Sequence, residues 1–222
     1  MVKPVHARMP ADERRVQLLD AAVDLFSRKG FGGTTTKEIA AAAGVNEAVI
    51  FRHFATKQQL YTAILDHRLQ KAGKTEWLAT TKECMERGDD EGLFRAIAKI
   101  IIHAHRADPK FERLMLYSGL EGHELASMHH RQMSLPIFDM LRQYVRRRQR
   151  DGALRQCDPG LIIVAIAGMA QHYAMMTEIF GLREITASDD DVVETFTCIV
   201  LDGVRIKSRK TATVKKKAAK KR

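Results

Sequence analysis

Residues 35–57, TTKEIAAAAGVNEAVIFRHFATK, contain two short helical patterns separated by a single glycine. The first pattern starts with Thr35-x-x-Glu38, the spacing of a capping box, in which two side chains satisfy free backbone N–H groups at a helix start. Gly44 can adopt the left-handed conformation that ends a helix. The second pattern follows at once, from Asn46 to Phe54. Two short helices joined this tightly predict a helix-turn-helix motif.

This helix pair has one apolar side and one polar side. The apolar side, which we expect to be buried, consists of Ile39, Ala40, Ala43, Val45, Ile50 and Phe54. The outer side of the second helix, suited to base edges in a DNA major groove, carries Asn46, Glu47, Ala48, Val49 and Arg52. Candidate phosphate contacts beside it are His53, Lys57 and the backbone N–H groups at Thr35 and Thr36. A DNA-reading surface is one interpretation, and a helical hairpin with merely solvated polar residues is the other.

Two further helices are expected around this motif. The first begins near Asp12, ends at Gly30 and has an apolar stripe of Val16, Leu19, Ala22, Val23 and Phe26. The other follows Thr56-x-x-Gln59, with Leu60, Ile64 and Leu69 expected to face inward. The four helices together predict one compact N-terminal unit, residues 1–68.

The flanks of the motif follow a known pattern. The stretch LLDAAVDLFSRKGFGGTTTKEIAAAAGVNEAVIFRHFATKQQLYTAIL contains a helix, Gly-aromatic, Thr-Thr, Ile-Ala-x-x-Ala-Gly-Val, aromatic-x-His-Phe and x-Lys-x-x-Leu. Residues 12–66 therefore resemble the DNA-binding domain of the tetracycline-repressor (TetR) family. The resemblance implies that DNA meets Thr36, Lys37, Asn46, Glu47, Ala48 and Val49, with Phe51, His53 and Lys57 at the DNA backbone. That family usually has tyrosine where this chain has Phe51, so a phosphate hydrogen bond from that hydroxyl is absent.

The remainder of the chain is also expected to be helical, which makes the fold class all-α. Helical spacing covers residues 91–106, 109–121 and 135–150, and no stretch alternates as a strand would. Two final helices are expected to begin at Asp158-Pro159 and at Ser188, because both sites combine a capping side chain with a favourable first turn.

The first of these two final helices contains LIIVAIAGMA, which is apolar on every side. Such a helix needs more cover than one chain is expected to give, which predicts a two-fold homodimer. The resemblance implies the same, since members of that family pair through their last two helices. The candidate interface residues are Ile163, Ile166, Met169, Val192, Phe196 and Ile199. The recognition helices of such a dimer should lie about 34–36 Å apart, or a multiple of this, on a palindromic operator.

The resemblance also implies a pocket for a small-molecule effector within residues 69–206. The candidate pocket residues are His105, Leu114, Tyr117, Met133, Phe138, His172 and Met176. Each of these residue types is also common in an ordinary filled core, where methionine packs into irregular gaps and buried histidine is hydrogen-bonded.

The positive charge of the chain is concentrated at one end. The formal charge is +10, but nine of the 37 basic residues lie in residues 207–222, and the rest carries 28 basic against 27 acidic residues. This tail, KSRKTATVKKKAAKKR, has almost no large apolar residue and is expected to be disordered. It is either a solvated tail or a tether that binds DNA without reading its sequence.

Other functional classes lack their motifs. The chain has no phosphate loop, Gly-x-Ser-x-Gly elbow, His-Glu-x-x-His pair or dinucleotide glycine pattern, and YSGLEGHEL reads as a helix junction. The three cysteines and the histidines complete no recognisable ligand set, so neither a metal nor another cofactor is expected. The longest apolar run, residues 161–170, stops before membrane-spanning length at Gln171 and His172.

The prediction is thus a cytoplasmic, ligand-responsive transcription regulator that acts at the bacterial nucleoid as a repressor. A small, largely apolar effector is expected to release it from its operator. The competing class is a small all-α enzyme or binding protein that keeps the helix-turn-helix unit only as a scaffold.

Overall fold

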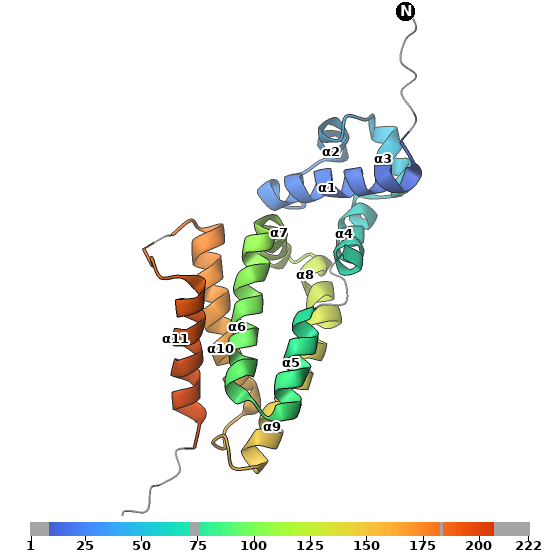
Figure 1. Cartoon of the computed structure of the whole chain (residues 1–222). Helices are drawn as coiled ribbons and strands as arrows, with labels where there is room; N and C mark the ends of the chain where they lie inside the picture. Colours follow the sequence, from blue (N-terminus) through green and yellow to red (C-terminus); the bar gives the residue numbers. More distant parts are fainter. Residues whose placement is uncertain (1–8, 72–75, 183, 207–222) are drawn as a thin grey trace, which may run out of the picture.

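The computed structural model describes residues 9–71, 76–182 and 184–206, and the regular elements in these ranges are helices (Figure 1). Within them, extended pairing is confined to one isolated bridge between Leu154 and Arg205. The all-α prediction is confirmed. The N-terminal helices are α1 (Ala11–Lys29), α2 (Thr36–Ala42), α3 (Glu47–His53) and α4 (Lys57–Lys71). The others are α5 (Glu76–Arg87), α6 (Asp90–Ala107), α7 (Pro109–Leu120), α8 (Glu124–His129), α9 (Leu135–Arg150), α10 (Pro159–Ala174) and α11 (Asp189–Val204), with π-helical segments η1 (His130–Ser134) and η2 (Met175–Ile179).

The helix-turn-helix forms as its local sequence requires. The Thr35 backbone N–H donates to Glu38 at 2.8 Å, and the Glu38 N–H donates to the Thr35 hydroxyl at 3.2 Å, which completes the capping box. Gly44 has a φ of +64°, in the left-handed region where a side chain would be strained. The Asn46 side chain then caps α3 by accepting from the Val49 N–H at 3.2 Å.

Helices α5 and α8 were not predicted, and their sequences explain why. Where the structure describes its side chains, α5 buries Thr81 and Cys84, so its inward side lacks the large aliphatic residues that mark the other helices. Helix α8 is only six residues long before the chain enters η1. The stretch YSGLEGHEL is the junction between α7 and α8, with a turn at Glu121 and Gly122.

The apolar core of the N-terminal unit extends beyond residue 68. Leu18, Phe26, Ile39 and Ile50 are fully buried in it. Phe111, Leu114 and Leu125 belong to the same core, although they come from α7 and α8. Leu18 lies outside the predicted stripe of α1 and is nevertheless buried, because α1 packs on α7 as well as on α2 and α4. Helix α1 is therefore shared between the N-terminal unit and the larger unit.

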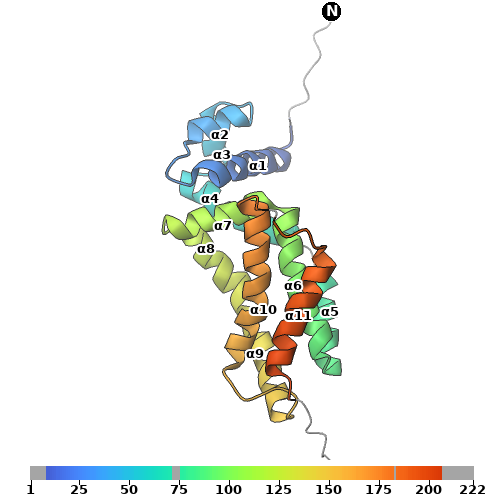
Figure 2. The same cartoon turned by 90° about the vertical axis from the view of Figure 1, so that its left-hand side faces the viewer.

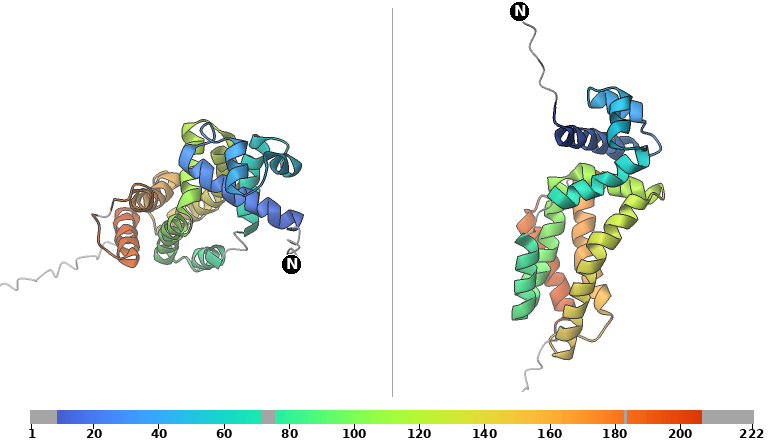
Figure 3. Two further views of the ribbon diagram at one scale, coloured as in Figure 1. Left: turned by 90° about the horizontal axis from the view of Figure 1, so that it is seen from above. Right: turned by 90° about the vertical axis from the view of Figure 1, so that its right-hand side faces the viewer.

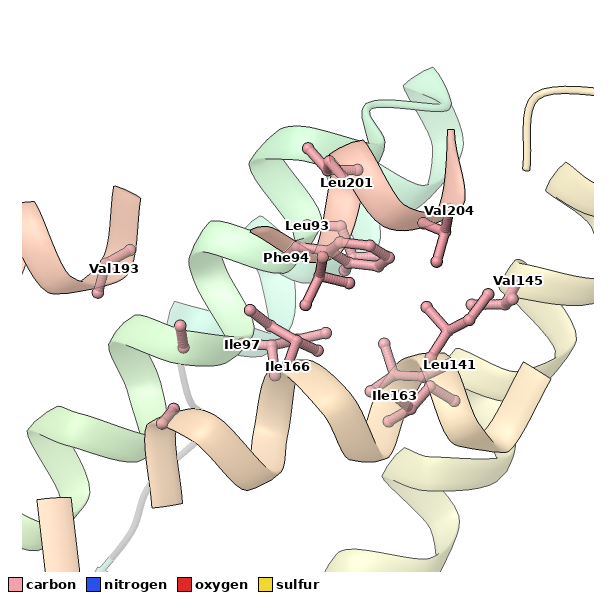
Figure 4. Close-up of a cluster of buried hydrophobic side chains, with 14 of the residues drawn as sticks. Leu93, Phe94, Ile97, Leu141, Val145, Ile163, Ile166, Val193, Leu201 and Val204 are labelled. Atoms are coloured by element: carbon pink, nitrogen blue, oxygen red, sulfur yellow. The ribbon is translucent and has the colours of Figure 1, made fainter. Parts of the chain in front are cut away.

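The larger unit is built around α6, which packs on α5, α10 and α11 (Figures 1 and 3). Its core is a second cluster of buried aliphatic and aromatic side chains, in which Leu93 and Ile166 are completely buried (Figure 4). Helix α10 with η2, Pro159–Ile179, is long and apolar enough by composition to cross a membrane. It packs here against α6, α9 and α11, so the core accounts for much of its apolar character.

The packing around Ile166 gives a test of this core. Ile166→Ala is expected to lower the free energy of unfolding by about 3 kcal/mol, because the side chain is fully buried and leaves a cavity. Urea unfolding followed by circular dichroism, at one fixed protein concentration, measures the change. Glu83→Ala, an exposed position on α5, is the control and should stay within about 0.5 kcal/mol of the parent. Equal effects of the two substitutions would contradict the placement of Ile166.

Candidate functional site

Helices α2 and α3 lie at the end of the molecule farthest from the α5–α6 turn, with α1 between them and the larger unit (Figures 1 and 2). They present an open surface. Lys37, Asn46, Ala48, Phe51 and Arg52 are exposed on this surface, and Phe51 is 49% exposed. A large aromatic ring left in water, on helices that also expose a lysine and an arginine, is a feature to be expected of a surface that binds a partner.

The remaining candidate residues on these helices have local structural roles as well. The Thr36 hydroxyl donates to the Glu47 carboxylate, which ties the start of α2 to the start of α3. Asn46 uses its side-chain oxygen to cap α3, so only its NH₂ group remains as a donor to a partner. Thr35 is engaged in the capping box. Val49 and His53 are half-buried at the edge of the surface.

Helix α1 holds the ends of both short helices. The Gln17 amide donates to the carbonyl of Ala43 at 3.1 Å, at the end of α2. Arg15 donates to the carbonyl of His53 at 3.3 Å, at the end of α3, and its guanidinium lies 4.3 Å from the centre of the Phe54 ring. The sequence analysis did not identify Arg15 or Gln17. Their spacing on α1 marks them only as polar residues, and the carbonyls they reach are about 26 to 38 positions away.

An ion pair reinforces the start of α2. The Lys29 ammonium lies 2.7 Å from the Glu38 carboxylate. This contact first, and then the hydrogen bonds from Thr35, lower the pKa of Glu38 to about 2. Glu38 thus remains ionised over the whole physiological range.

Lys57 does not point outward as expected of a phosphate donor. Its ammonium donates to the carbonyl of Phe31 at 2.5 Å and lies 4.1 Å from the centre of the Phe31 ring. Burial lowers the pKa of Lys57, opposed by the charges of Glu121 and Glu38. The side chain is occupied inside the unit, where it joins the start of α4 to the turn after α1.

That turn is docked on the junction between α7 and α8. The Phe31 backbone N–H donates to the Glu121 carboxylate at 2.8 Å, and the His123 ring centre lies 4.3 Å from that of Phe31. Tyr117, expected in the effector pocket, instead donates its hydroxyl to the Arg28 carbonyl at 3.2 Å. The end of α1 is therefore in direct contact with α7, so a change in the position of one affects the other.

A cavity of about 140 Å³ lies within the larger unit, between α6, α7, α10 and η2. Its lining residues are His105, Glu112, Met115, Leu116, Gln171, Met175 and Ile179. A wider, open hollow of about 520 Å³ is lined by glutamines and arginines alone: Gln143, Arg146, Gln149, Arg150 and Gln156.

Of the residues expected in an effector pocket, His105 is the one that lines the smaller cavity. Leu114 is buried in the core shared with α1, and Phe138 packs against the core around α6. His172 is exposed on α10, and Met133 and Met176 are half-buried outside the cavity. Sequence reasoning overlooked Glu112 and Gln171 because polar residues on helices are usually solvated.

Three polar side chains meet at this cavity: His105 is buried, Glu112 is half-buried and Gln171 is exposed on α10. The His105 Nδ1 lies 3.0 Å from the Ile101 carbonyl oxygen, and its Nε2 lies 2.9 Å from the Gln171 side-chain nitrogen. The Glu112 carboxylate is 3.6 Å from the same Nε2. Burial raises the pKa of Glu112, although the charges of His105 and Arg68 oppose this shift. Within the described residues there is no group of three side chains suited to hold a metal ion.

Helices α10 and α11 lie side by side (Figure 2), and each carries exposed apolar and small residues at helical spacing. Leu161 is 67% exposed, Val164 56% and Ile199 57%. Gly168 and Gly203 have open space where a side chain would begin, which lets another backbone approach closely. We call the stripe formed by Leu161, Val164, Gly168, Ile199 and Gly203 the α10–α11 face.

The structure changes the list of candidate interface residues. Ile163, Ile166 and Val192 are buried in the chain's own core, because α10 and α11 turn these positions toward α6. Met169 and Phe196 are half-buried and also pack on that core. Among the residues named from sequence, Ile199 is the one that lies on the α10–α11 face.

Comparison with known proteins finds bacterial transcription regulators. Residues 18–64 match the family described as bacterial regulatory proteins, tetR family, and residues 94–195 match the tetracyclin repressor-like C-terminal domain. The regulator RutR of Escherichia coli K12 is 26% identical over 197 residues, covering 86% of this chain and 91% of RutR. The repressor Rv3405c of Mycobacterium tuberculosis H37Rv is 45% identical over 62 residues, covering 27% of this chain and 33% of the repressor.

Solved structures share the fold. AibR in complex with isovaleryl coenzyme A and operator DNA has a TM-score of 0.62 at 20% identity, covering 84% of this chain and 97% of AibR. A TetR family regulator from Marinobacter aquaeolei VT8 has a TM-score of 0.61 at 16% identity, covering 88% of this chain and 97% of the other. At these identities the likeness concerns the arrangement of helices.

The ion pair at α2 gives a pH test. The folded pKa of Glu38, about 2, lies below its ordinary value of 4.5, so its contribution to stability is present above pH 4.5 and is lost as the pH falls toward 2. Glu38→Gln keeps the capping-box geometry but removes the charge. The stability lost by the parent between pH 4.5 and 2, measured by urea unfolding, should therefore be larger than that lost by the variant. Identical pH profiles would contradict the assigned pKa.

Proposed function

The chain belongs to the TetR family of bacterial regulatory proteins, and we propose that it binds a palindromic operator as a homodimer and leaves it when an effector enters the larger unit. The single observation that carries this proposal is the open α2–α3 surface, held by α1 at the end of the molecule. Its relatives include proteins named as a regulator, an activator and a repressor, and of these roles we propose repression. They favour regulation over an enzyme or binding protein that keeps the motif as a scaffold.

The DNA contacts divide into two groups in this proposal. Lys37, Asn46, Glu47, Ala48 and Val49 would face base edges, with α3 in the major groove. The others would lie at the DNA backbone: Thr35, Thr36, Phe51, Arg52 and His53. Arg52 would supply a charge beside Phe51, which lacks the hydroxyl of the usual tyrosine. Lys57 would act indirectly, by holding the turn at Phe31.

Dimerisation would use the α10–α11 face. Two copies of this stripe, related by a two-fold axis, would bury its exposed aliphatic residues and let the helices cross closely at Gly168 and Gly203. Such a dimer would place two α3 helices on one side of the assembly, as a palindromic operator requires.

The effector would act through the contacts between the two units. AibR was solved with both isovaleryl coenzyme A and operator DNA, which supports an effector site in this fold. In this chain the cavity touches α7 at Glu112, Met115 and Leu116, and α7 ends at the Glu121 contact with Phe31. A shift of α7 on effector binding would therefore move α1 and α4, and with them the α2–α3 surface of each subunit. A coupling of about 1–3 kcal/mol changes operator affinity about 5- to 150-fold, and operator would weaken effector binding by the same factor.

The assignment of chain segments is part of the proposal. Residues 1–68 would be the DNA-binding unit and residues 69–206 the effector-binding and dimerisation unit, working in the cytoplasm at the nucleoid. The tail, residues 207–222, was predicted to be disordered, as either a solvated tail or a DNA tether, and it lies outside the described residues.

Lys37 tests the base-reading surface. Lys37→Ala is expected to cost about 1–3 kcal/mol of affinity for a duplex selected from a random library, because the exposed lysine would reach a base edge. Electrophoretic mobility shift at fixed salt measures the loss. Lys82→Ala, exposed on α5, is the matched control and should leave affinity unchanged. Asn46 is a poorer choice, since its replacement also removes the α3 cap. An equal loss on random DNA would refute a base contact by Lys37.

A charged side chain introduced on the α10–α11 face tests its role in dimerisation. Ile199→Asp is expected to convert a dimer into a monomer at micromolar concentration, because an unpaired carboxylate would be buried in the interface. Light scattering after size exclusion gives the mass. Asp190→Ala, at an exposed position on the same helix, should remain dimeric. A parent protein that is monomeric, or an Ile199→Asp variant that stays dimeric, would rule out this face.

A further inference from the structure

We infer that the cavity between α6, α7, α10 and η2 selects a ligand of about one ring in size that carries an N–H donor, neutral or cationic, and that it disfavours organic acids. This inference rests on the proposed function, since it treats the cavity as the effector site. It adds the chemical class of the effector, which follows from the volume, the charge and the hydrogen-bonding groups of the lining.

The volume limits the size of the ligand. The cavity holds about 140 Å³, and a cavity of about 150 Å³ in another protein accommodates a benzene molecule. Its apolar wall consists of Met115, Leu116, Met175 and Ile179. A single ring with one or two substituents fits this space. An entire acyl coenzyme A does not, although such a molecule is the ligand of AibR.

The charge of the lining determines which single-ring compounds are favoured. Glu112 is the carboxylate of the lining, and the other polar members are the His105 imidazole and the Gln171 amide. The lining contains neither lysine nor arginine. The Glu112 side chain is 22% exposed, so an anion brought beside it would meet a like charge with little water between them. A carboxylic acid would therefore bind poorly in its ionised form.

The hydrogen bonds within the cavity leave Glu112 as the charged acceptor for a ligand, beside the neutral side-chain oxygen of Gln171. A carbonyl oxygen can only accept, so the His105 Nδ1 carries a proton toward Ile101, and Nε2 meets the Gln171 amide. The 3.6 Å between Nε2 and the Glu112 oxygen exceeds a hydrogen bond. Both ring nitrogens of His105 are thus already used. The carboxylate oxygens keep the capacity to accept N–H groups from a ligand that lies against the methionines.

The backbone of η2 supplies a second, independent observation. Residues Met175–Ile179 form a π-helical turn that directly follows α10, and Met175 and Ile179 at its two ends both line the cavity. The Phe180 N–H donates to the Met175 carbonyl, five residues back, at 3.2 Å. Single π turns are rare and occur often at functional sites. Here the wider turn shapes one wall of the cavity.

Proton linkage follows from the surroundings of Glu112. Burial raises the pKa of Glu112, the charges of Arg68 and of His105 in its protonated form oppose the rise, and Asp108 adds to it. A bound cation favours the ionised carboxylate, so binding should release a proton in the pH range where free Glu112 is protonated. Affinity for a cationic ligand should accordingly increase as the pH rises through the pKa of Glu112.

Four probes of nearly equal shape test the inference on the full-length protein: benzylamine, benzamide, benzoate and toluene. Titration calorimetry should show benzylamine and benzamide binding at least about tenfold more tightly than benzoate, since a hydrogen bond to a charged acceptor favours them. Benzoate binding as tightly as benzylamine would overturn the inference. So would toluene binding as tightly as both N–H probes, or no binding by any of the four.

A matched pair of variants locates the effect. Glu112→Gln should abolish the advantage of benzylamine over benzoate, while Glu194→Gln, which breaks a surface ion pair with Arg95, should preserve it. Should Glu112→Gln fail to fold, calorimetry of the parent in two buffers of different ionisation enthalpy replaces it. Proton release with benzylamine but not with toluene supports the inference, and equal release overturns it.

The role of the cavity as effector site has a separate readout. Operator affinity measured with saturating benzylamine reports on release, independently of binding. If the N–H probes bind with the expected preference but operator affinity is unchanged, the ligand class stands and the effector role of the cavity fails. If operator affinity falls with benzoate and toluene as strongly as with benzylamine, the selectivity fails and the effector role stands.

Discussion

Helix α1 is buried on two sides, and the arrangement of the whole molecule depends on this burial. One side packs on α2 and α4, and the other packs on α7. The aromatic and aliphatic residues of α1 therefore enter one core with Phe111 and Leu125 from the larger unit. At roughly 25 cal/mol for each Å² of apolar surface, a shared core of this kind resists separation of the two units far more than the exposed ion pairs beside it.

The polar contacts around this core contribute less to the stability of the interface between the two units than to their relative position. Lys110 lies 2.6 Å from Asp24, and this contact is the largest cause that lowers the pKa of Asp24. Glu121 accepts from the backbone of Phe31, and Gln58 donates to Glu124 at 2.7 Å. These bonds are directional, so a movement of α7 has to break them or carry α1 and α4 with it. A ligand in the cavity next to α7 is thus well placed to change the position of the α2–α3 surface.

Much of the molecule was predictable from local sequence. The capping box at Thr35 and the glycine turn at Gly44 are set by residues that act on their own neighbours, and both formed as predicted. The Asn46 cap is equally local, although the sequence analysis named Asn46 as a DNA contact and not as a cap. The limits of α9 and the cap of α11 at Ser188 are likewise determined by residues close to them in the sequence. Helix α5 was missed because tertiary packing buries a threonine and a cysteine there, which carry little apolar signal in a sequence.

The amino-acid sequence by itself determined the helical fold class, the helix-turn-helix and the membership of a regulator family, because capping, glycine conformation and apolar periodicity act over a few residues. Only the tertiary structure decided which side of each helix is left free. Ile163 and Ile166 are buried, while Leu161 and Val164 are exposed. The Lys57 ammonium donates to the Phe31 carbonyl and so does not face solvent as a phosphate donor would. The tertiary structure also brought His105, Glu112 and Gln171 together from three helices. The reason is that a helix with apolar residues on every side has no sequence pattern that identifies its buried face. The sequence around a polar residue likewise does not identify a partner that is distant along the chain.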